Sequence, residues 1–283
     1  MSALFGPAGN SDSFYALGYK HSYQSPEYIA KMGLDAYEYS AGNGIMGGEK
    51  VFRAIGEEAK KHGIALSFHT PYYISLSGVD PEKRLKSLEY ISKSLWAAEL
   101  MGADLIVIHA GSAAKISREE ALYLASDTLS KALEAHPDTS VRFGVETMGK
   151  VNQLGTLEEV LTLCKMDARL WPVVDFGHVN ARACGGVFKS ADDYRRVFDK
   201  TATVLGTERA MHMHCHFSKI EYTSAGEKRH LTFEDTTYGP DFEPLMECLV
   251  KEKLCPRIIC ESNGTMAEDA LQMKNCYLSK KTT

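Results

Sequence analysis

The chain has 283 residues, of which 44% are hydrophobic and 24% are charged, and its formal net charge is −5. A chain of this length can bury a large core, and its weakly negative charge provides no global attraction to nucleic acid or to an anionic membrane. The N-terminus lacks a basic segment followed by an apolar core, and no apolar run approaches the roughly 18 residues of a membrane span, so we expect a cytoplasmic protein without a signal peptide or a membrane partner.

Short apolar runs alternate with longer amphipathic segments along the whole chain. The runs predicted to be strands are residues 3–6, 35–40, 64–69, 104–109, 141–146, 171–177, 210–217 and 257–262. The predicted helices cover residues 25–33, 49–63, 80–102, 117–136, 156–166, 190–206, 241–253 and 267–281. Asp80, Ser117 and Thr156 are typical N-terminal helix caps. Gly63 and Gly102 are typical residues at helix ends.

Eight strand–helix units without a Pro/Gly/Ser-rich linker predict a single α/β domain over residues 1–283. Apolar strands that alternate with helices indicate a parallel sheet covered by helices. A (β/α)8 TIM barrel accommodates eight units in about 280 residues best. An open doubly wound sheet is the alternative, but no GxGxxG or GxxxxGK[ST] motif follows an early strand. The poorly patterned stretch 218–240 is predicted to be an active-site loop.

Six successive predicted strands end in side chains that can bind metals or transfer protons. In chain order these are His69, His109, Glu146, Asp175 followed by His178, the histidines of 212–216, and Glu261. In a barrel, the C-terminal ends of the strands meet at one mouth, where catalytic residues lie. A single polar residue at a strand end is commonly a structural cap, but several buried carboxylates are costly unless they are paired or metal-bound. The combination of imidazole and carboxylate predicts a zinc or manganese site.

The segment MHMHCHF, residues 211–217, places three histidines on alternate positions of a predicted strand. Side chains at i, i+2 and i+4 share one face of a strand, so His212, His214 and His216 should face the barrel interior at three depths. The intervening Met, Cys and Phe side chains should pack against the surrounding helices. Three histidines spread over about 13 Å cannot bind one metal together.

The strand ends resemble those of the endonuclease IV family, the family 2 apurinic/apyrimidinic endonucleases, within the broader xylose isomerase-like barrels. The resemblance is carried, in order, by SFHTPYY, ADLIVIHAGS, VRFGVETMGK, VVDFGHVNA, MHCHFSK, the RH of KRHLTF and IICESN, from residue 64 to about residue 263. Each motif alone is weak, whereas their order and spacing together are specific for the superfamily. The resemblance implies a TIM barrel with a cluster of two or three zinc ions, with manganese as the alternative ion.

The resemblance also implies which residues bind each metal. His69 and His109 would hold the first ion, and Glu146 would bridge it to the second. Asp175, His214 and Glu261 would complete the second ion, and His178 and His230 would hold the third. The family has an aspartate two residues before the histidine that matches His230, whereas this sequence has Lys228 there. The candidate replacements are Glu227, His216 and Glu234.

The implied activity is hydrolysis of DNA on the 5′ side of abasic sites, with abasic DNA as the binding partner and no obligate protein partner. Glu146 and Glu261 would be catalytic, and the third metal or Lys219 would stabilise the leaving oxygen. Tyr72 and His216 are the candidate substrate-binding residues, and His216 is also a candidate for hydrogen bonding to a metal ligand.

The main alternative is a sugar isomerase or epimerase, which needs one divalent metal held by Glu146, Asp175, His214 and Glu261, with the two glutamates as acid and base. A metal-binding protein without catalytic activity is the third hypothesis.

Overall fold

The computed structural model describes residues 2–282, and its centre is a barrel of eight parallel strands. The strands are β1 (Leu4–Pro7), β2 (Ala36–Ser40), β3 (Ala65–His69), β4 (Leu105–His109), β5 (Arg142–Glu146), β6 (Leu170–Asp175), β7 (His214–Phe217) and β10 (Arg257–Cys260). Hydrogen bonds join them in the order β1-β10-β7-β6-β5-β4-β3-β2, and a parallel bridge from Ala8 to Glu38 brings the two ends together. The predicted (β/α)8 architecture is therefore confirmed.

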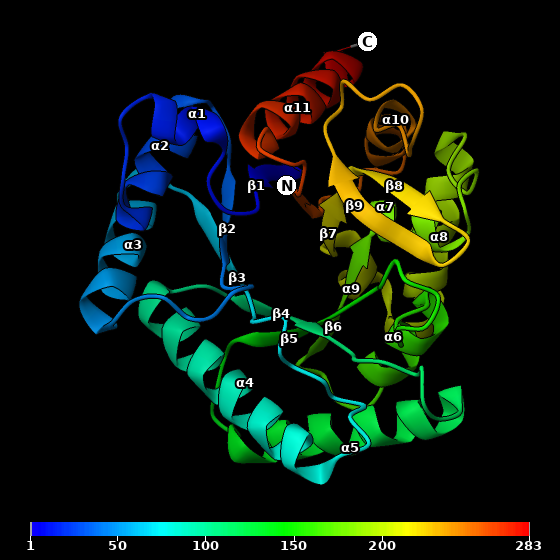
Figure 1. The fold of residues 1–283 in the computed structure, drawn as a ribbon. Helices are drawn as coiled ribbons and strands as arrows, with labels where there is room; N and C mark the ends of the chain where they lie inside the picture. Colours follow the sequence, from blue (N-terminus) through cyan, green and yellow to red (C-terminus); the bar gives the residue numbers. More distant parts are fainter. Residues whose placement is uncertain (1, 283) are drawn as a thin grey trace.

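Helices surround this barrel on all sides (Figure 1). They are α1 (Asp12–Ala16), α2 (Ser25–Lys31), α3 (Glu49–His62), α4 (Pro81–Met101), α5 (Arg118–Ala135), α6 (Leu157–Cys164), α7 (Phe176–Arg182), α8 (Ala191–Leu205), α9 (Thr207–Met211), α10 (Glu243–Lys251) and α11 (Met266–Thr282), with the short 3-10 helix η1 (Ser22–Gln24). None of the described helices is long and apolar enough to cross a membrane.

Local sequence signals set the helix ends as predicted. The Ser117 hydroxyl accepts a hydrogen bond from the Glu120 amide at the start of α5, and the Asp80 carboxylate caps α4 in the same way. Thr156 forms a reciprocal capping box at the start of α6. Gly63 and Gly102 end α3 and α4 in the left-handed region, with φ of 69° and 71°, which an L-residue adopts only with strain.

The strands close into a barrel because small residues permit close approach of neighbouring backbones. A Cβ on Gly6 of β1 would overlap the carbonyl oxygen of Ala36 on β2. The apolar face of each strand packs against the helices: Met213, Cys215 and Phe217 of β7 are all buried in the main core. The opposite face of each strand points into the barrel, where the polar residues of the mouth lie.

Side chains fill the lower part of the barrel, beneath the residues of the mouth. Asp104 forms ion pairs with Arg142 and with Arg257, whose Nη2 lies 2.7 Å from the Asp104 Oδ1 atom. Above this floor, Leu105, Val107 and Val173 form a small apolar cluster separate from the main core. Because residues two apart share one face of a strand, the Val107 side chain lies one layer below that of His109. The apolar layer therefore packs directly beneath the mouth.

The structure corrects two predictions between residues 206 and 240. The predicted strand 210–217 begins later, because α9 occupies residues 207–211 and His212 is the residue that ends this helix. His212 is therefore not a barrel-layer residue. The predicted loop 218–240 contains the antiparallel strands β8 (Lys219–Thr223) and β9 (Gly226–Leu231), which form a hairpin beside α7 (Figure 1).

Candidate metal centre

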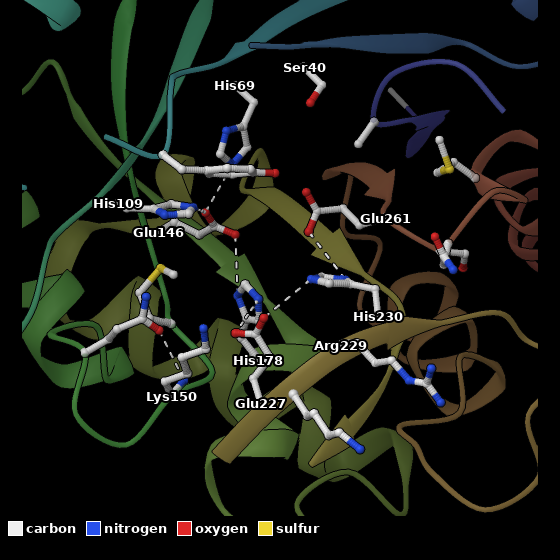
Figure 2. Close-up of a pocket in the computed structure, with 18 of the residues that line it drawn as sticks. Ser40, His69, His109, Glu146, Lys150, His178, Glu227, Arg229, His230 and Glu261 are labelled. Atoms are coloured by element: carbon white, nitrogen blue, oxygen red, sulfur yellow. Dashed lines mark hydrogen bonds and ion pairs between the residues drawn. The ribbon is translucent and has the colours of Figure 1, made fainter. Parts of the chain in front are cut away.

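The C-terminal ends of the barrel strands surround a cavity of about 710 Å³. The predicted residues that line it are His69, Tyr72, His109, Glu146, His178, His230 and Glu261. Figure 2 labels all of these except Tyr72, and it shows that the polar ends of the labelled ones point toward one another, although they come from β3, β4, β5, α7, β9 and the end of β10. The ligand side chains of the mouth form three groups, in each of which the potential ligand atoms lie within 4.8 Å of one another. A fourth such group, Glu38, His214 and His216, lies one layer below them.

The first group consists of His69, His109 and Glu146. The Glu146 Oε2 atom lies 3.0 Å from His109 Nε2 and 3.5 Å from His69 Nε2. The His69 Nδ1 atom lies 2.9 Å from the Thr70 carbonyl oxygen. Because a carbonyl oxygen only accepts hydrogen bonds, Nδ1 carries a proton, and Nε2 is the atom that can bind a metal.

Burial and charge act in opposite directions on these histidines. Burial opposes the charged form of His69, but hydrogen bonding and the charge of Glu146 outweigh it and raise the pKa of His69 to about 8. Burial dominates at His109 and lowers its pKa. Burial would raise the pKa of Glu146, yet the charge of His216 and hydrogen bonds from the surrounding histidines hold it well below its usual range. Glu146 is thus an anionic centre surrounded by imidazoles.

The second group consists of Glu146, Asp175, His216 and Glu261. The His216 Nδ1 atom lies 3.0 Å from Glu146 Oε1 and 3.5 Å from Glu261 Oε1. Asp175 ends β6 and caps α7, with its Oδ1 atom accepting a hydrogen bond from the His178 amide at 2.8 Å. Its Oδ2 atom lies 3.2 Å from His178 Nδ1 and is buried without a hydrogen bond from a described residue. Burial raises the pKa of Glu261, which makes this carboxyl a candidate proton acceptor and donor.

The structure places His216, and not His214, in this second group. The reason is strand register: Asp175 of β6 pairs with His216 of β7, whereas His214 pairs with Val173 one layer lower. Two residues correspond to about 6.6 Å along a strand. His214 Nε2 instead lies 2.9 Å from the Glu38 carboxylate, below the mouth. The predicted assignment of His214 to the metal with Asp175 is therefore corrected to His216.

The third group consists of His178, Glu227 and His230. The Glu227 carboxylate lies 3.3 Å from His178 Nε2 and 3.9 Å from His230 Nε2. His178 is anchored as His69 is, with Nδ1 2.9 Å from the Thr147 carbonyl oxygen. Burial opposes the charged form of His178, but Asp175, Glu227 and Glu146 raise its pKa to about 9.

A β-bulge explains how Glu227 takes the place of the expected aspartate. Glu221 pairs with Arg229 and Tyr222 pairs with Glu227, so Lys228 is an extra residue in β9. Residues three apart normally point to opposite faces of a strand, but an inserted residue returns them to the same face. Glu227 and the histidine at 230 therefore both face His178, while Lys228 forms an ion pair of 2.6 Å with Glu221.

Several buried polar atoms in the centre lack a hydrogen bond from any described residue. They are Glu38 Oε1, Glu146 Oε2, Asp175 Oδ2 and His216 Nε2. Glu38 Oε1 and His216 Nε2 lie 3.0 Å from each other below the mouth, whereas Glu146 Oε2 and Asp175 Oδ2 belong to the mouth groups. Buried polar atoms are nearly always satisfied, so these two carboxylate oxygens indicate a missing partner there. Nitrogen and oxygen donors at this spacing fit a divalent metal such as zinc. The residues present therefore fit the predicted metals.

The remaining predicted residues have different surroundings. Tyr72 lies at the rim, where its ring stacks on His109 at a centroid distance of 5.4 Å. Burial, followed by the charge of Glu261, raises the pKa of Tyr72 to about 12. Lys219 was predicted to be catalytic, but its ammonium donates to the Asp235 carbonyl oxygen at 2.6 Å and does not line the cavity. Its ammonium also lies 3.2 Å from the Asp241 carboxylate, so it links β8 to the segment after β9.

Sequence reasoning missed Glu38, which lies on β2 and is fully buried. Its carboxylate contacts both His214 and His216. The available signal was a charged residue at the central position of the apolar strand AYEYS, since alternation with Ala36 and Ser40 places it on the barrel face. The prediction considered only residues at strand ends.

Comparison with known proteins agrees with this architecture. A family model described as a xylose isomerase-like TIM barrel matches residues 26–276. A protein of Methanocaldococcus jannaschii described as uncharacterised is 28% identical over 97% of this chain and 96% of its own length. A protein of Acholeplasma laidlawii described as a probable endonuclease 4 is 32% identical over 71% of this chain and 69% of its own length.

Solved structures with the same fold include proteins of two activities. A D-tagatose 3-epimerase-like protein has a TM-score of 0.70 at 19% identity, covering 99% of this chain and 98% of its own. Endonuclease IV from Thermus thermophilus has a TM-score of 0.67 at 18% identity, covering 98% of both chains. Likeness at this identity establishes the common barrel and leaves the activity to the residues of the mouth.

Proposed function

Because the chain belongs to the xylose isomerase-like TIM barrel family, we propose that it is a metal-dependent phosphodiesterase of the endonuclease IV type, which hydrolyses DNA on the 5′ side of abasic sites. The observation that carries this proposal is the presence of three adjacent ligand groups at one mouth, two of which share Glu146. The relatives described as probable endonuclease 4 support the same activity.

The number of ligand groups is the feature that separates the two candidate activities. An isomerase or epimerase with one metal would need only the second group, which supplies Glu146, Asp175, His216 and Glu261. It would have no use for the two histidines on β3 and β4, or for a third group of two histidines and a carboxylate. Phosphodiester hydrolysis uses several metals, because both the attacking and the leaving oxygen carry charge.

When bound, divalent metals at this centre would activate water and neutralise the phosphate. The chain supplies the remaining functions. Glu146 joins the first two groups, and Glu261, with its raised pKa, is placed to accept a proton from water at the second group. Tyr72 offers an exposed ring at the rim on which a base or an abasic sugar can stack.

Cations at the rim provide contacts for an anionic substrate despite the negative net charge. Lys150, Lys228 and Arg229 all line the cavity (Figure 2 labels the first and the last). Glu221 pairs with Lys228 and Arg229 and orients both side chains. Phosphate contacts of this kind supply affinity without sequence specificity, as an enzyme that recognises a missing base requires.

A sugar epimerase remains the second candidate, because the second group alone forms a complete site for one metal with two glutamates on it. The D-tagatose 3-epimerase-like structure and an E. coli 3-keto-D-glucoside 4-epimerase share the fold, the latter with a TM-score of 0.70 at 16% identity over the full length of both chains. Glu146 and Glu261 would then exchange a proton with opposite faces of a sugar carbon.

The test combines metal content with two activity assays. We expect two or three zinc ions per chain and incision of a duplex that contains one abasic site, with the undamaged duplex as the control. His109→Ala should impair incision strongly, because it removes a ligand of the first group, and a one-metal epimerase should tolerate it better. One metal per chain, epimerisation of a ketose and an intact abasic duplex would refute the proposal and favour the epimerase.

A further inference from the structure

Glu38 is a buried carboxylate that lies directly beneath the metal centre and is not part of its three mouth groups. Its Oε1 atom lies 3.0 Å from His216 Nε2. Its Oε2 atom accepts hydrogen bonds from the Ser67 hydroxyl at 2.8 Å and from His214 Nε2 at 2.9 Å. All four side chains are buried, so none of these contacts is shared with bulk water.

We propose that Glu38 is a positioning residue of the metal centre, which holds the Nε2–H of His216 and thereby turns the Nδ1 lone pair of His216 toward Glu146, Asp175 and Glu261. This inference rests on the proposed metal-dependent function. It goes beyond that function because it assigns a role to a residue that lies outside the three mouth groups. It also assigns His214 to the support of Glu38.

The other histidines of the centre show the same division of labour between their two ring nitrogens. In His69 and His178, Nδ1 is held by a backbone carbonyl oxygen at 2.9 Å, and Nε2 faces the carboxylates of the mouth. In His216 the ring is reversed: Nδ1 lies 3.0 Å from Glu146 in the mouth, and Nε2 faces away from it. A carboxylate on β2 then occupies the place that a backbone carbonyl occupies for the other two.

The contacts of Glu38 explain why one of its oxygens is available for His216. The Ser67 hydroxyl and the His214 imidazole both donate to Oε2, which fixes the plane and the rotamer of the carboxylate. The Oε1 atom has no hydrogen bond from a described residue, and neither has His216 Nε2, although the two are 3.0 Å apart. Their separation places this pair within hydrogen-bonding distance of each other.

A carboxylate has a stronger effect on the ring than a carbonyl would have. A metal-binding histidine that donates its second N–H to a carboxylate is a more basic ligand with a fixed orientation, and loss of such a partner typically weakens metal binding about 10–100-fold. His216 stands beside three carboxylates in the second group, so its ring would otherwise have several competing partners. By holding Nε2, Glu38 selects one orientation of the His216 ring.

The experiment compares Glu38→Ala, Glu38→Gln and a control, Asp269→Asn, in the full chain. Asp269 is also a buried carboxylate, but it accepts from the Phe233 amide outside the centre, so its variant controls for general loss of stability. Each protein is freed of metal and titrated with Co²⁺ while its visible absorption spectrum and metal content are recorded. Circular dichroism confirms that each variant is folded.

We expect the wild type to bind several cobalt ions, and Glu38→Ala to bind one of them about 10–100-fold more weakly with an altered spectrum. Glu38→Gln should recover part of this affinity, because its amide oxygen can still accept from His216. Asp269→Asn should match the wild type. The inference would be overturned if Glu38→Ala had the same spectrum and cobalt affinity as the wild type. It would also be overturned if Glu38 itself held a cobalt ion, which Glu38→Ala would then lack in its stoichiometry.

These results also separate the inference from the proposed function. Weakened cobalt binding in Glu38→Ala, combined with a wild type that does not cleave abasic DNA, would leave the positioning role intact and remove the phosphodiesterase. Abasic-site cleavage by the wild type, combined with normal cobalt binding by Glu38→Ala, would leave the phosphodiesterase intact and remove the positioning role. A wild type that binds no divalent metal would overturn both.

Discussion

The β-bulge of β9 leads to a prediction that separates the structure from a residue-by-residue sequence match. The match places Lys228 where the endonuclease IV family has an aspartate, whereas the structure places Glu227 between His178 and His230. We therefore expect Glu227→Gln to abolish stable metal binding at the third group. Lys228→Asp should leave it unchanged, because the Lys228 ammonium pairs with Glu221 and is not among the ligands of the third group.

The size of the effect follows from the composition of the group. Glu227 is the only carboxylate among three ligands, so its loss should weaken binding by at least the roughly 100-fold reached when an outer partner is removed. At a zinc concentration about 100 times the original Kd, a 100-fold weaker site loses about 2.3 kcal/mol of zinc-dependent stabilisation. For a chain of this size the melting temperature should fall by roughly 5 °C.

Lys228→Asp has a smaller and different cost. The Lys228 side chain is 56% exposed, and exposed ion pairs contribute about 0.2–1 kcal/mol. Arg229 stays paired with Glu221 in this variant. The loss should also be the same with and without chelator, since it does not depend on metal.

The assay is thermal unfolding with zinc and with chelator, together with zinc content after dialysis. The zinc-dependent part of the melting temperature should shrink in Glu227→Gln and persist in Lys228→Asp. Deletion of Lys228 provides a further check, because it removes the bulge and leaves Glu227 and His230 two residues apart on one face. Normal zinc content in Glu227→Gln, or its loss in Lys228→Asp, would refute the reasoning from the bulge.

Three further variants test other parts of the structure. Lys219→Met should retain zinc and lose about 1–3 kcal/mol of stability, because its buried contact with the segment after β9 is lost; zinc content and urea unfolding measure this. Tyr72→Ala should raise the KM for abasic DNA by the equivalent of about 1–3 kcal/mol of lost stacking. Its kcat should stay unchanged, since the ring lies over His109 at the rim. Gly6→Ala should destabilise the barrel by about 1–3 kcal/mol or more in thermal unfolding, because its Cβ would overlap the Ala36 backbone.

The barrel and most of its mouth could be predicted from the sequence because parallel strands share one direction. If each strand ends in a polar residue, the ends of β3, β4, β5 and β6 must meet at the same edge, whatever their separation in the chain. His69, His109, Glu146 and Asp175 were expected at this edge on this ground alone, and the structure places each at the end of its strand. No information on register was needed, since each of them is the last residue of its strand.

The position of His216 could not be predicted in the same way, because it lies within its strand. The sequence shows that His214 and His216 share one face, but only the pairing with β6 decides which of them is level with Asp175. The helical turn at residues 207–211 was also concealed, since its Ala and Met residues continue the apolar run of the strand. A helix of five residues gives too little periodicity to distinguish it from a strand.

Glu227 was a candidate rather than a prediction for a related reason. Its spacing of three residues from His230 is wrong for one face of a regular strand, so alternation argues against it. A bulge reverses this conclusion, and a bulge is determined by the pairing partner as much as by the bulged strand. Here Glu221 pairs with Arg229 and also accepts a hydrogen bond from the Lys228 ammonium. These contacts stabilise the extra residue on the side of Glu221.

The arrangement of the three groups shows where this barrel could change its chemistry. The second group comes from β5, β6, β7 and the end of β10, which are fixed by the register of the barrel itself. The first and third groups add side chains from β3, β4, α7 and the β8–β9 hairpin, on either side of it. A one-metal and a several-metal enzyme can therefore share the central group, and the difference lies in the flanking histidines. The bulge at Lys228 is informative for this reason: it preserves a carboxylate in the third group where the sequence match had lost one, which is the outcome expected if all three groups are used.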